Sequence, residues 1–423
     1  MSLFRKNIII NHSTQVISTI SNLLCMIMTA RILGTFGQGD LALYNTFIAV
    51  VLLISGLGIP SAFVYFLASK KMNVQKAIPI MFSVTLVSFS ILILFYILGG
   101  YLQFIQVFLP HFIQSNYTWT FVMFMQLSMM SMNQYLQSIL IAENKFSKSG
   151  YITIIGSLAL LFLYSLKFFN FVSSNIEPLF WVVGSMLLVA MIQYIFYFIH
   201  IRNTNPFYLK FLSISFNDVK PMIAFSALTY MANIIQFLNY KMDIWFLNYF
   251  QNDSNLIGIY SLGVSLAQLV WLLPNAVQAV LYTYVSSNEN AMQDKVSKTK
   301  RVSNWALLYA LIVGIGGYLI SIYLIPILFG EAFSRSIQII KILIIGIIPF
   351  VYSFGISAYF AGIKKIEFNL YGSLIGFVVC LILNAILIPK YSIEGAAWSS
   401  VVSYIITVLF ITYKFNTYKK LSN

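Results

Sequence analysis

Long apolar segments, separated by short clusters of charged residues, run through almost the whole chain. Of its 423 residues, 60% are hydrophobic and only 9% are charged, whereas soluble proteins average about 25% charged residues. A water-soluble fold of this length needs a charged outer shell, which so few charges cannot supply. The pattern therefore predicts an integral membrane protein. It excludes a secreted enzyme, a cytosolic domain and a disordered chain.

Twelve of the apolar segments are long enough to cross a bilayer as helices, because about 20 helical residues span roughly 30 Å of hydrocarbon. They are expected near 7–33, 41–67, 77–99, 118–141, 150–169, 179–200, 221–248, 257–285, 302–328, 336–361, 367–388 and 394–413. No connection between them is long enough to form a soluble domain. The predicted fold class is an all-α membrane protein with twelve transmembrane helices.

The basic residues occur in clusters that alternate between the two ends of these segments. With a cytoplasmic N-terminus, most of the 25 lysines and arginines fall in the connections on the cytoplasmic side. The positive-inside rule then predicts that both termini are cytoplasmic. The same clustering argues against nucleic acid as a partner despite the net charge of +14, since no basic stripe could follow a phosphate backbone.

The chain lacks the motifs of an enzyme or of an ATP-driven pump. It has no Walker A sequence, no paired carboxylates for a nucleotide-sugar metal site and no cluster of metal ligands. Cys25 and Cys380 each lie in an apolar run, which is typical of inert buried thiols. We therefore expect no enzymatic activity, no metal site and no cofactor. The energy for transport would come from a gradient of H⁺ or Na⁺, from the membrane potential, or from consumption of the substrate on the far side of the membrane.

Short motifs recur in the two halves of the chain at an offset of about 216–220 residues. The similar stretches are 39–44 with 255–260, and 142–146 with 362–366. Six spans per half would give both halves the same orientation in the membrane. We therefore predict an N-terminal lobe (1–205, spans 1–6) and a C-terminal lobe (206–423, spans 7–12) that enclose a central cavity and open alternately. Helix-breaking residues lie at matched positions in the halves, at 55–60 and 272–275.

Polar residues at helical spacing form a stripe on the first span of each half. The stripes are Asn11, Gln15, Ser18, Asn22 and Thr29 in the first span, and Thr229, Asn233, Gln236, Tyr240 and Asp243 in the seventh. The fourth and eighth spans add further polar residues to this set: Gln126, Asn133 and Gln137 in the fourth, and Ser261, Ser265, Gln268 and Asn275 in the eighth. Membrane helices turn such residues away from lipid, so the stripes predict a hydrated cavity that binds the substrate. The alternative is that these amides form hydrogen bonds between packed helices.

Asp243 is the only carboxylate in the interior of a predicted span, since Glu367 and Glu394 are the first residues of theirs. A charge at the centre of a membrane helix costs about 2.5–3.5 kcal/mol on insertion scales. Asp243 is thus a candidate to bind a coupling H⁺ or Na⁺, or to pair with a base such as Arg31. Lys241 lies about 200° around the helix from that stripe. Arg31 and Lys341, near the outer ends of spans 1 and 10, are candidates to bind an anionic headgroup or to anchor the helices in the interface.

Several short motifs resemble one family of transporters over the whole chain. They are Ala30–Gly34, Gly37-x-Gly39, Leu41–Tyr44 and Gly56–Gly58 followed by Ser61–Ala62 in the first half, and Gly258–Leu262, Pro274 and Ile393–Trp398 in the second. This set resembles the polysaccharide (O-antigen, Wzx-type) flippases of the MATE-like MOP exporter superfamily. The Arg-x-Leu-Gly start at Arg31–Gly34 favours the polysaccharide branch over the multidrug MATE exporters.

The resemblance implies transport of an undecaprenyl-pyrophosphate-linked oligosaccharide across the bacterial cytoplasmic (inner) membrane, for O-antigen, lipopolysaccharide or capsule synthesis. It leaves open a polysaccharide polymerase and chain-length proteins as partners. Three alternatives remain: a MATE-type multidrug or cation antiporter, a membrane-embedded polymerase and a non-transporting scaffold. A polymerase usually has a long outer loop or a carboxylate pair, and this chain has neither.

Overall fold

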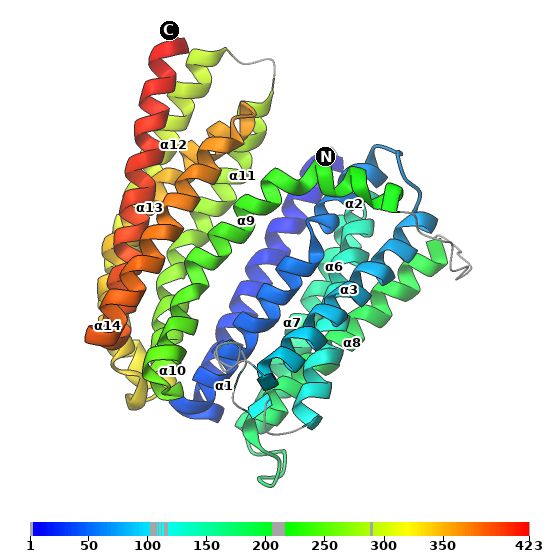
Figure 1. Ribbon diagram of the computed structural model, residues 1–423, viewed down its shortest axis with the longest axis vertical. Helices are drawn as coiled ribbons and strands as arrows, with labels where there is room; N and C mark the ends of the chain where they lie inside the picture. Colours follow the sequence, from blue (N-terminus) through cyan, green and yellow to red (C-terminus); the bar gives the residue numbers. More distant parts are fainter. Residues whose placement is uncertain are drawn as a thin grey trace. The chain divides into compact units, whose positions relative to one another are not determined.

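The computed structural model describes the backbone of residues 3–101, 108, 110, 112–113, 117–204, 216–287 and 291–422 (Figure 1). Within these ranges the side chains of 3–13, 95, 99–101, 216–218, 228–229 and 419–422 are not described. All regular structure in the described residues is helical. This agrees with the predicted all-helical membrane class.

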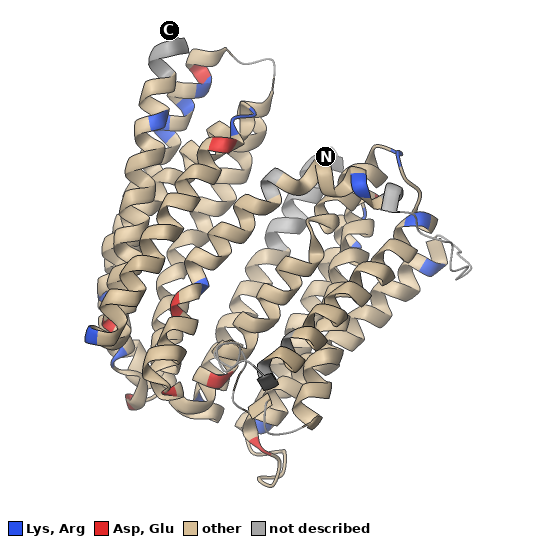
Figure 2. Ribbon diagram, in the orientation of Figure 1, with Lys and Arg blue, Asp and Glu red and all other residues tan. Residues whose placement is uncertain are grey.

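The helices follow one another through the chain with short connections. They are α1 (Leu3–Gly56), α2 (Ile59–Ala68), α3 (Val74–Tyr101), α6 (Tyr117–Ala142), α7 (Phe146–Phe168), α8 (Pro178–Thr204), α9 (Phe216–Gln251), α10 (Ser254–Ala267), η1 (Gln268–Trp271), α11 (Leu272–Ser286), α12 (Met292–Leu324), η2 (Ile325–Phe329), η3 (Glu331–Phe333), α13 (Ser336–Gly362) and α14 (Ile366–Ser422). Charged residues gather mostly near the ends of the helices (Figure 2).

Eight helices of the described chain are long and apolar enough to cross a membrane, and a ninth is added if the bent halves of α9 count as one span. The protein is therefore a multi-span membrane protein. The lengths and compositions of the described helices give eight or nine spans, not the predicted twelve. One reason is that α1 and α14 each run through a predicted connection, with one non-helical residue, Gly34 or Ser392, at the kink. The count of twelve stays a prediction.

The chain divides into two compact units. The first contains residues 1–34 and 43–230, and the second contains residues 35–42 and 231–423. The predicted boundary between lobes, at 205/206, lies outside the described residues. The division into lobes 1–205 and 206–423 therefore stays a prediction.

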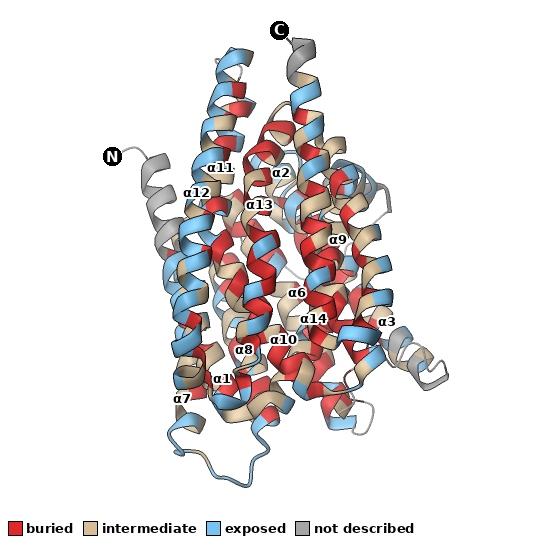
Figure 3. Cartoon of the chain, turned by 90° about the vertical axis from the view of Figure 1, so that its left-hand side faces the viewer, coloured by how far each residue is buried: buried red, intermediate tan, exposed pale blue. Residues whose placement is uncertain are grey.

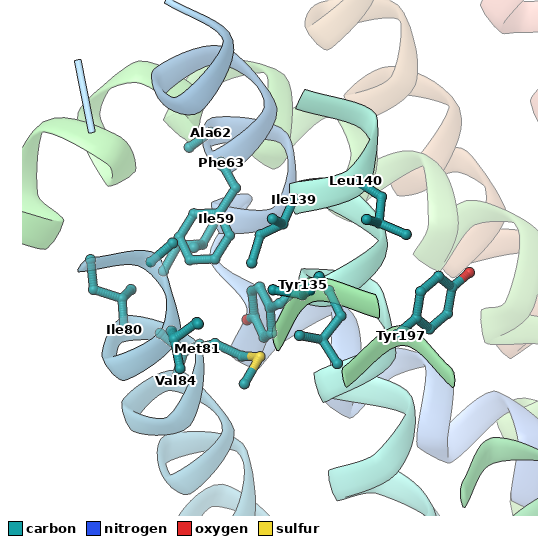
Figure 4. Close-up of a cluster of buried hydrophobic side chains, with 14 of the residues drawn as sticks. Ile59, Ala62, Phe63, Ile80, Met81, Val84, Tyr135, Ile139, Leu140 and Tyr197 are labelled. Carbon is teal, nitrogen blue, oxygen red and sulfur yellow. The ribbon is translucent and has the colours of Figure 1, made fainter. Parts of the chain in front are cut away.

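An apolar core of the first unit comes mostly from α2, α3, α6 and α8, with Ile152 of α7 and Met222 of α9 (Figure 4). Ile59, Phe63, Met81 and Tyr135 are all almost completely buried. The rings of Phe63 and Tyr135 lie 5.6 Å apart between centroids. Aromatic and branched side chains at helical spacing thus pack α2 and α6 together, as expected for residues that face away from lipid.

The second unit is built around α13. Of the most apolar stretch of α13, 72% is buried, against 17% for the corresponding stretch of α12. Figure 3 shows this difference as a largely buried α13 beside a largely exposed α12. The exposed apolar side chains of α12 include Trp305, Ile312 and Tyr323. We conclude that α12 presents a surface suited to lipid, whereas α13 is the central helix of its unit.

The same helix-ending turn occurs at both copies of the repeated motif, and in the first unit also at Lys70 and Asn170. Asn144 and Lys364 both have positive φ, 59° and 62°. The next residue donates its backbone N–H five positions back in both cases, from Lys145 to Leu140 (2.9 Å) and from Lys365 to Phe360 (2.8 Å). This is the hydrogen bonding of a Schellman turn. The similar sequences at 142–146 and 362–366 therefore have the same local structure.

Both predicted helix-breaking stretches lie at interruptions of the helices. In the first unit α1 ends at Gly56 and α2 begins at Ile59, and the two residues between them have positive φ. In the second unit the 3₁₀ segment η1 separates α10 from α11, whose first turn contains Pro274. Proline and glycine interrupt the hydrogen bonding of a helix, which explains why the interruptions occur at these places.

Candidate functional site

Asp243 on α9 is buried inside the second unit, with 2% of its surface exposed. Tyr260 of α10, also fully buried, donates its hydroxyl to carboxylate oxygen Oδ2. The backbone N–H of Ile244 donates to Oδ1 at 2.9 Å. A carboxylate can be held in an apolar interior only when hydrogen bonds or charges compensate for the lost water. Tyr260 supplies part of this compensation from a second helix.

A polar face of α14 continues this site. Ser399, Ser400, Ser403 and Thr407 are all buried. The hydroxyl of Ser403 lies 3.0 Å from the side-chain oxygen of Asn239, one turn before Asp243 on α9, and 2.9 Å from the carbonyl oxygen of Gly376. These contacts join α9 to both halves of α14, which places hydroxyl and amide groups in the same interior as the carboxylate.

Asn384 is a polar residue of this interior whose carbonyl group has no visible partner. The side chain is 0% exposed, and its Nδ2 lies 3.5 Å from Sγ of Cys380. Within the described residues its Oδ1 is buried and accepts no hydrogen bond. Buried polar atoms are normally satisfied, so an unsatisfied oxygen points to a group that the structure does not contain or to stored strain. It is an acceptor in the same unit as Asp243.

Five aromatic side chains form a cluster beside these polar groups. The cluster consists of Tyr240, Trp271, Phe350, Phe354 and Tyr404. The shortest separation between ring centroids is 4.7 Å, for Phe350 and Tyr404, and the rings of Tyr240 and Trp271 lie 5.0 Å apart. Gln236 of the predicted stripe donates from Nε2 to the hydroxyl of Tyr240 at 2.6 Å. The cluster therefore links the polar stripe of α9 to α13 and α14.

The structure brings part of the predicted stripe of the seventh span together. Gln236, Tyr240 and Asp243 contribute to the contacts above, whereas Asn233 is exposed on α9. Lys241, two residues from Asp243, is half-buried. Gln268, half-buried, begins η1, and Lys341 is exposed on α13. The side chain of Thr229 lies outside the described residues.

The predicted site residues of the first unit show two kinds of environment. Gln15, Asn22 and Arg31 are exposed along α1, whereas Asn133 and Gln137 on α6 are half-buried. Asn133 donates from Nδ2 to the carbonyl of Ala190 on α8 at 2.9 Å. That is an interhelical hydrogen bond of the kind in the packing alternative. The side chain of Asn11 lies outside the described residues.

Several buried polar residues were not singled out from the sequence. Tyr260, Asn384 and Tyr404 lie in largely apolar runs, and nothing in such a run indicates their partners. Tyr260 had one available signal, because it ends the repeated motif 255–260 as Tyr44 ends 39–44. Asp40 was assigned to a connection, but it is a buried carboxylate in α1 that accepts from Ser254 Oγ at 2.7 Å.

Comparison with solved structures shows the fold. The inward-facing structure of a multidrug resistance MATE family transporter of the MOP superfamily matches with a TM-score of 0.71 and 15% identity, over 98% of this chain and 99% of that chain. Lipid II flippase MurJ, in an inward closed conformation, matches with a TM-score of 0.67 and 15% identity, over 94% of this chain and 87% of that chain. A MOP superfamily transporter from Pyrococcus furiosus matches with a TM-score of 0.58 and 15% identity, over 99% of this chain and 96% of that chain.

Comparison of the sequence shows the family. No curated protein sequence matches the chain. The profile described as "Polysaccharide biosynthesis protein" matches residues 4–289, which is more than half of the chain. The protein belongs to the polysaccharide biosynthesis protein family and has the fold of the MATE-like and MurJ-like MOP superfamily.

Proposed function

We propose that this protein is an alternating-access flippase for a lipid-linked oligosaccharide, carried on undecaprenyl pyrophosphate, in the bacterial cytoplasmic (inner) membrane. The observation that carries the proposal is the family match over residues 4–289, on a fold shared with lipid II flippase MurJ. Sugars and pyrophosphate cannot cross hydrocarbon unaided. A polar groove in a membrane protein could carry them while the lipid tail stays in the bilayer. O-antigen and capsule synthesis are the pathways in which such a flippase acts.

The proposal includes twelve spans with both termini in the cytoplasm. As a straight helix the 54 residues of α1 would measure roughly 80 Å, far more than the roughly 30 Å of hydrocarbon. The two halves of α14 also contact each other, since Ser403 donates to the carbonyl of Gly376 and Thr407 lies 3.4 Å from that of Gly372. We therefore count α1 and α14 as two spans each. The alternation of basic residues supports the orientation.

We assign the coupling of transport to Asp243. A carboxylate can bind H⁺ directly, and together with neutral oxygen ligands it can bind Na⁺. The hydroxyl of Tyr260, the unsatisfied Oδ1 of Asn384 and the serines of α14 are neutral oxygens of the same unit. Gain or loss of the cation would change the hydrogen bond from Tyr260 and, through it, the packing of α10 against α9. The alternative from the sequence, in which Asp243 only pairs with a base, stays a prediction.

Substrate contacts are assigned to the exposed and half-buried polar residues of the predicted cavity. Arg31 and Lys341 carry positive charge for the pyrophosphate. Gln15, Asn22, Asn233, Gln236 and Gln268 offer amides for the sugars, and Asn133 and Gln137 complete the set proposed from the sequence. The hydrogen bond of Asn133 to Ala190 favours a packing role for that residue.

Deletion of the gene in the source strain tests the proposal without knowledge of the sugars. We expect loss of surface polysaccharide, accumulation of lipid-linked repeat units that remain accessible only from the cytoplasmic side, and recovery when the wild-type gene is returned. The similarity to a multidrug resistance MATE transporter supports a second candidate, a drug or cation antiporter. Normal polysaccharide in the deletion strain, together with lost efflux of cationic dyes, would replace the first function by the second.

A further inference from the structure

We propose that residues 35–42, the latch segment, dock reversibly on the start of α10 and must separate from it once in each transport cycle. The proposal rests on the proposed function, because a flippase has to change between two conformations. The contacts of the latch segment would hold the protein in one of these two conformations. The residues involved are Thr35, Gly39 and Asp40 on one side, and Ser254, Asn255 and Gly258 on the other.

The path of the chain gives the latch segment its special position. The first unit contains residues 1–34 and continues from Leu43, whereas residues 35–42 belong by their contacts to the second unit. The latch segment is therefore joined covalently to the first unit at both ends while its contacts are made in the second. We expect movement of the first unit to pull this segment off α10.

Two glycines let the backbones of the latch segment and α10 touch. A methyl group at Gly39 would overlap the carbonyl oxygen of Ser254. A methyl group at Gly258 would overlap the carbonyl oxygen of Thr35. The two helical segments thus approach each other so closely that no larger residue fits at either position, as in the close helix crossings of small residues in membranes. Both glycines belong to motifs that the sequence repeats in the two halves.

Two side-chain hydrogen bonds accompany this backbone contact. Ser254 Oγ donates to Oδ1 of Asp40 at 2.7 Å, and both residues are buried. At the exposed edge Thr35 Oγ1 donates to Oδ1 of Asn255 at 2.6 Å. Asn255 is held in place by Asp253, whose Oδ1 accepts from both the backbone N–H (2.8 Å) and the side-chain Nδ2 (3.1 Å) of Asn255. Hydroxyl hydrogen bonds of this kind make only modest net contributions, so water can replace them when the contact opens.

A backbone break precedes the contact on each side. Gly34, directly before the latch segment, has φ 64° and ψ −171°, and it is the one non-helical residue inside α1. Asn252, between the end of α9 and the N-cap residue Asp253 of α10, has φ 49°. Changes of φ and ψ at such positions can reorient a helix without unwinding it. The contact thus lies between two hinges, which is what a segment that docks and undocks requires.

Reversible cross-linking tests the latch segment. Thr35 and Asn255 are replaced by cysteine in a chain with Cys25→Ala and Cys380→Ala, expressed in the deletion strain, and joined by a short methanethiosulfonate cross-linker. We expect cross-linked peptides by mass spectrometry, at least tenfold lower export of newly made polysaccharide, and recovery after reduction. The matched control is Leu163→Cys with Trp181→Cys, which joins α7 to α8 within the first unit. This control should leave export unchanged. Normal export with the 35–255 pair fully cross-linked would overturn the proposal.

A measurement that does not depend on transport separates this proposal from the proposed function. Spin labels at positions 35 and 255 of the purified protein in lipid nanodiscs should give a dipolar-broadened population and a second, unbroadened one. Their ratio should change between Na⁺-containing and Na⁺-free buffer, between pH 6 and 8, or on addition of undecaprenyl pyrophosphate. A single broadened population under all these conditions would overturn the latch, whatever the substrate. Failure of the cysteine-free chain to restore polysaccharide would instead contradict the proposed function.

Discussion

Tyr44 in the first unit and Tyr260 in the second are both fully buried, and each ends one copy of the repeated motif. Each also donates its hydroxyl to a buried side chain, but the partners differ. Tyr44 donates to the amide oxygen of Gln126 on α6 at 2.7 Å, whereas Tyr260 donates to the carboxylate of Asp243 on α9. The amide has no charge to gain or lose. The comparison indicates that the first unit keeps this contact as fixed packing and that the second has the chemistry of a switch.

Removal of the buried carboxylate of Asp243 from the second unit should have the largest effect on transport. Asp243→Asn keeps the shape and the hydrogen bond to Tyr260 but cannot exchange a cation, so we expect export to fall by more than about tenfold, equivalent to about 1.4 kcal/mol. Complementation of the deletion strain measures it. Lys241→Gln, two residues away, should have a smaller effect. Wild-type activity of both variants would remove Asp243 from the mechanism.

A charge added to the first unit should damage stability rather than transport chemistry. Gln126→Glu places a carboxylate beside Tyr44, where only 1% of the residue is exposed. We expect a loss of about 2.5–3.5 kcal/mol, the range for a charge at a membrane-helix centre. The melting temperature in detergent gives the effect, and Gln126→Met is the uncharged control. If Gln126→Glu were as stable as wild type, both units would tolerate a buried carboxylate beside the tyrosine. The proposed difference between the Tyr44 and Tyr260 contacts would then be wrong.

Glycine substitutions compare the close backbone contact of α10 with an open position in the first unit. Gly258→Ala should weaken docking of the latch segment by about 1–3 kcal/mol, because the added methyl group meets the carbonyl of Thr35. Gly184→Ala on α8 has no atom within 4 Å of the added methyl and should leave stability unchanged or slightly higher. Spin-label populations at 35 and 255 report the first effect and thermal denaturation the second. Equal behaviour of the two variants would argue against a tight crossing.

The two tyrosine hydroxyls give a closely matched pair of substitutions. Tyr44→Phe leaves the amide oxygen of Gln126 buried without a donor, so we expect about 1–3 kcal/mol lower stability and export close to normal. Tyr260→Phe should instead change how export depends on pH or Na⁺, since it removes a donor from the proposed coupling group. Export measured across a range of pH and Na⁺ concentrations separates them. An unchanged cation dependence for Tyr260→Phe would show that this hydroxyl only packs.

The smallest effect is expected at an exposed residue. Arg31→Ala should raise the concentration of lipid-linked substrate needed for half-maximal flipping by a few-fold, because an exposed charge contributes about 0.2–1 kcal/mol. Flipping of a fluorescent undecaprenyl-pyrophosphate disaccharide in vesicles measures it. Arg31→Lys keeps the charge, so its substrate concentration for half-maximal flipping should lie between those of the wild type and of Arg31→Ala. Unchanged flipping by Arg31→Ala would show that the side chain only anchors α1 in the interface.

Asp243 could be selected from the sequence because a carboxylate inside an apolar run is costly wherever it points. Gln236 could be selected with it, because helical spacing places both on one stripe. Their contacts could not be predicted. The hydroxyl of Tyr260 comes from α10, and the unsatisfied oxygen of Asn384 and the buried serines come from the two halves of α14. An isolated polar residue in an apolar run gives no information about its partner.

Composition and segment length are enough to predict a helical membrane protein with mostly uncharged spans, because each segment enters lipid according to its own length and apolar character. Its short motifs also indicated the family that the profile match then showed. Three features could be seen only in the folded chain: the kinks of α1 and α14 at single residues, the hydrogen bond of Asn133 to α8, and the contact of residues 35–42 with α10. These features depend on which helices pack together, and side-chain periodicity shows the face of a helix but not the neighbour that covers it.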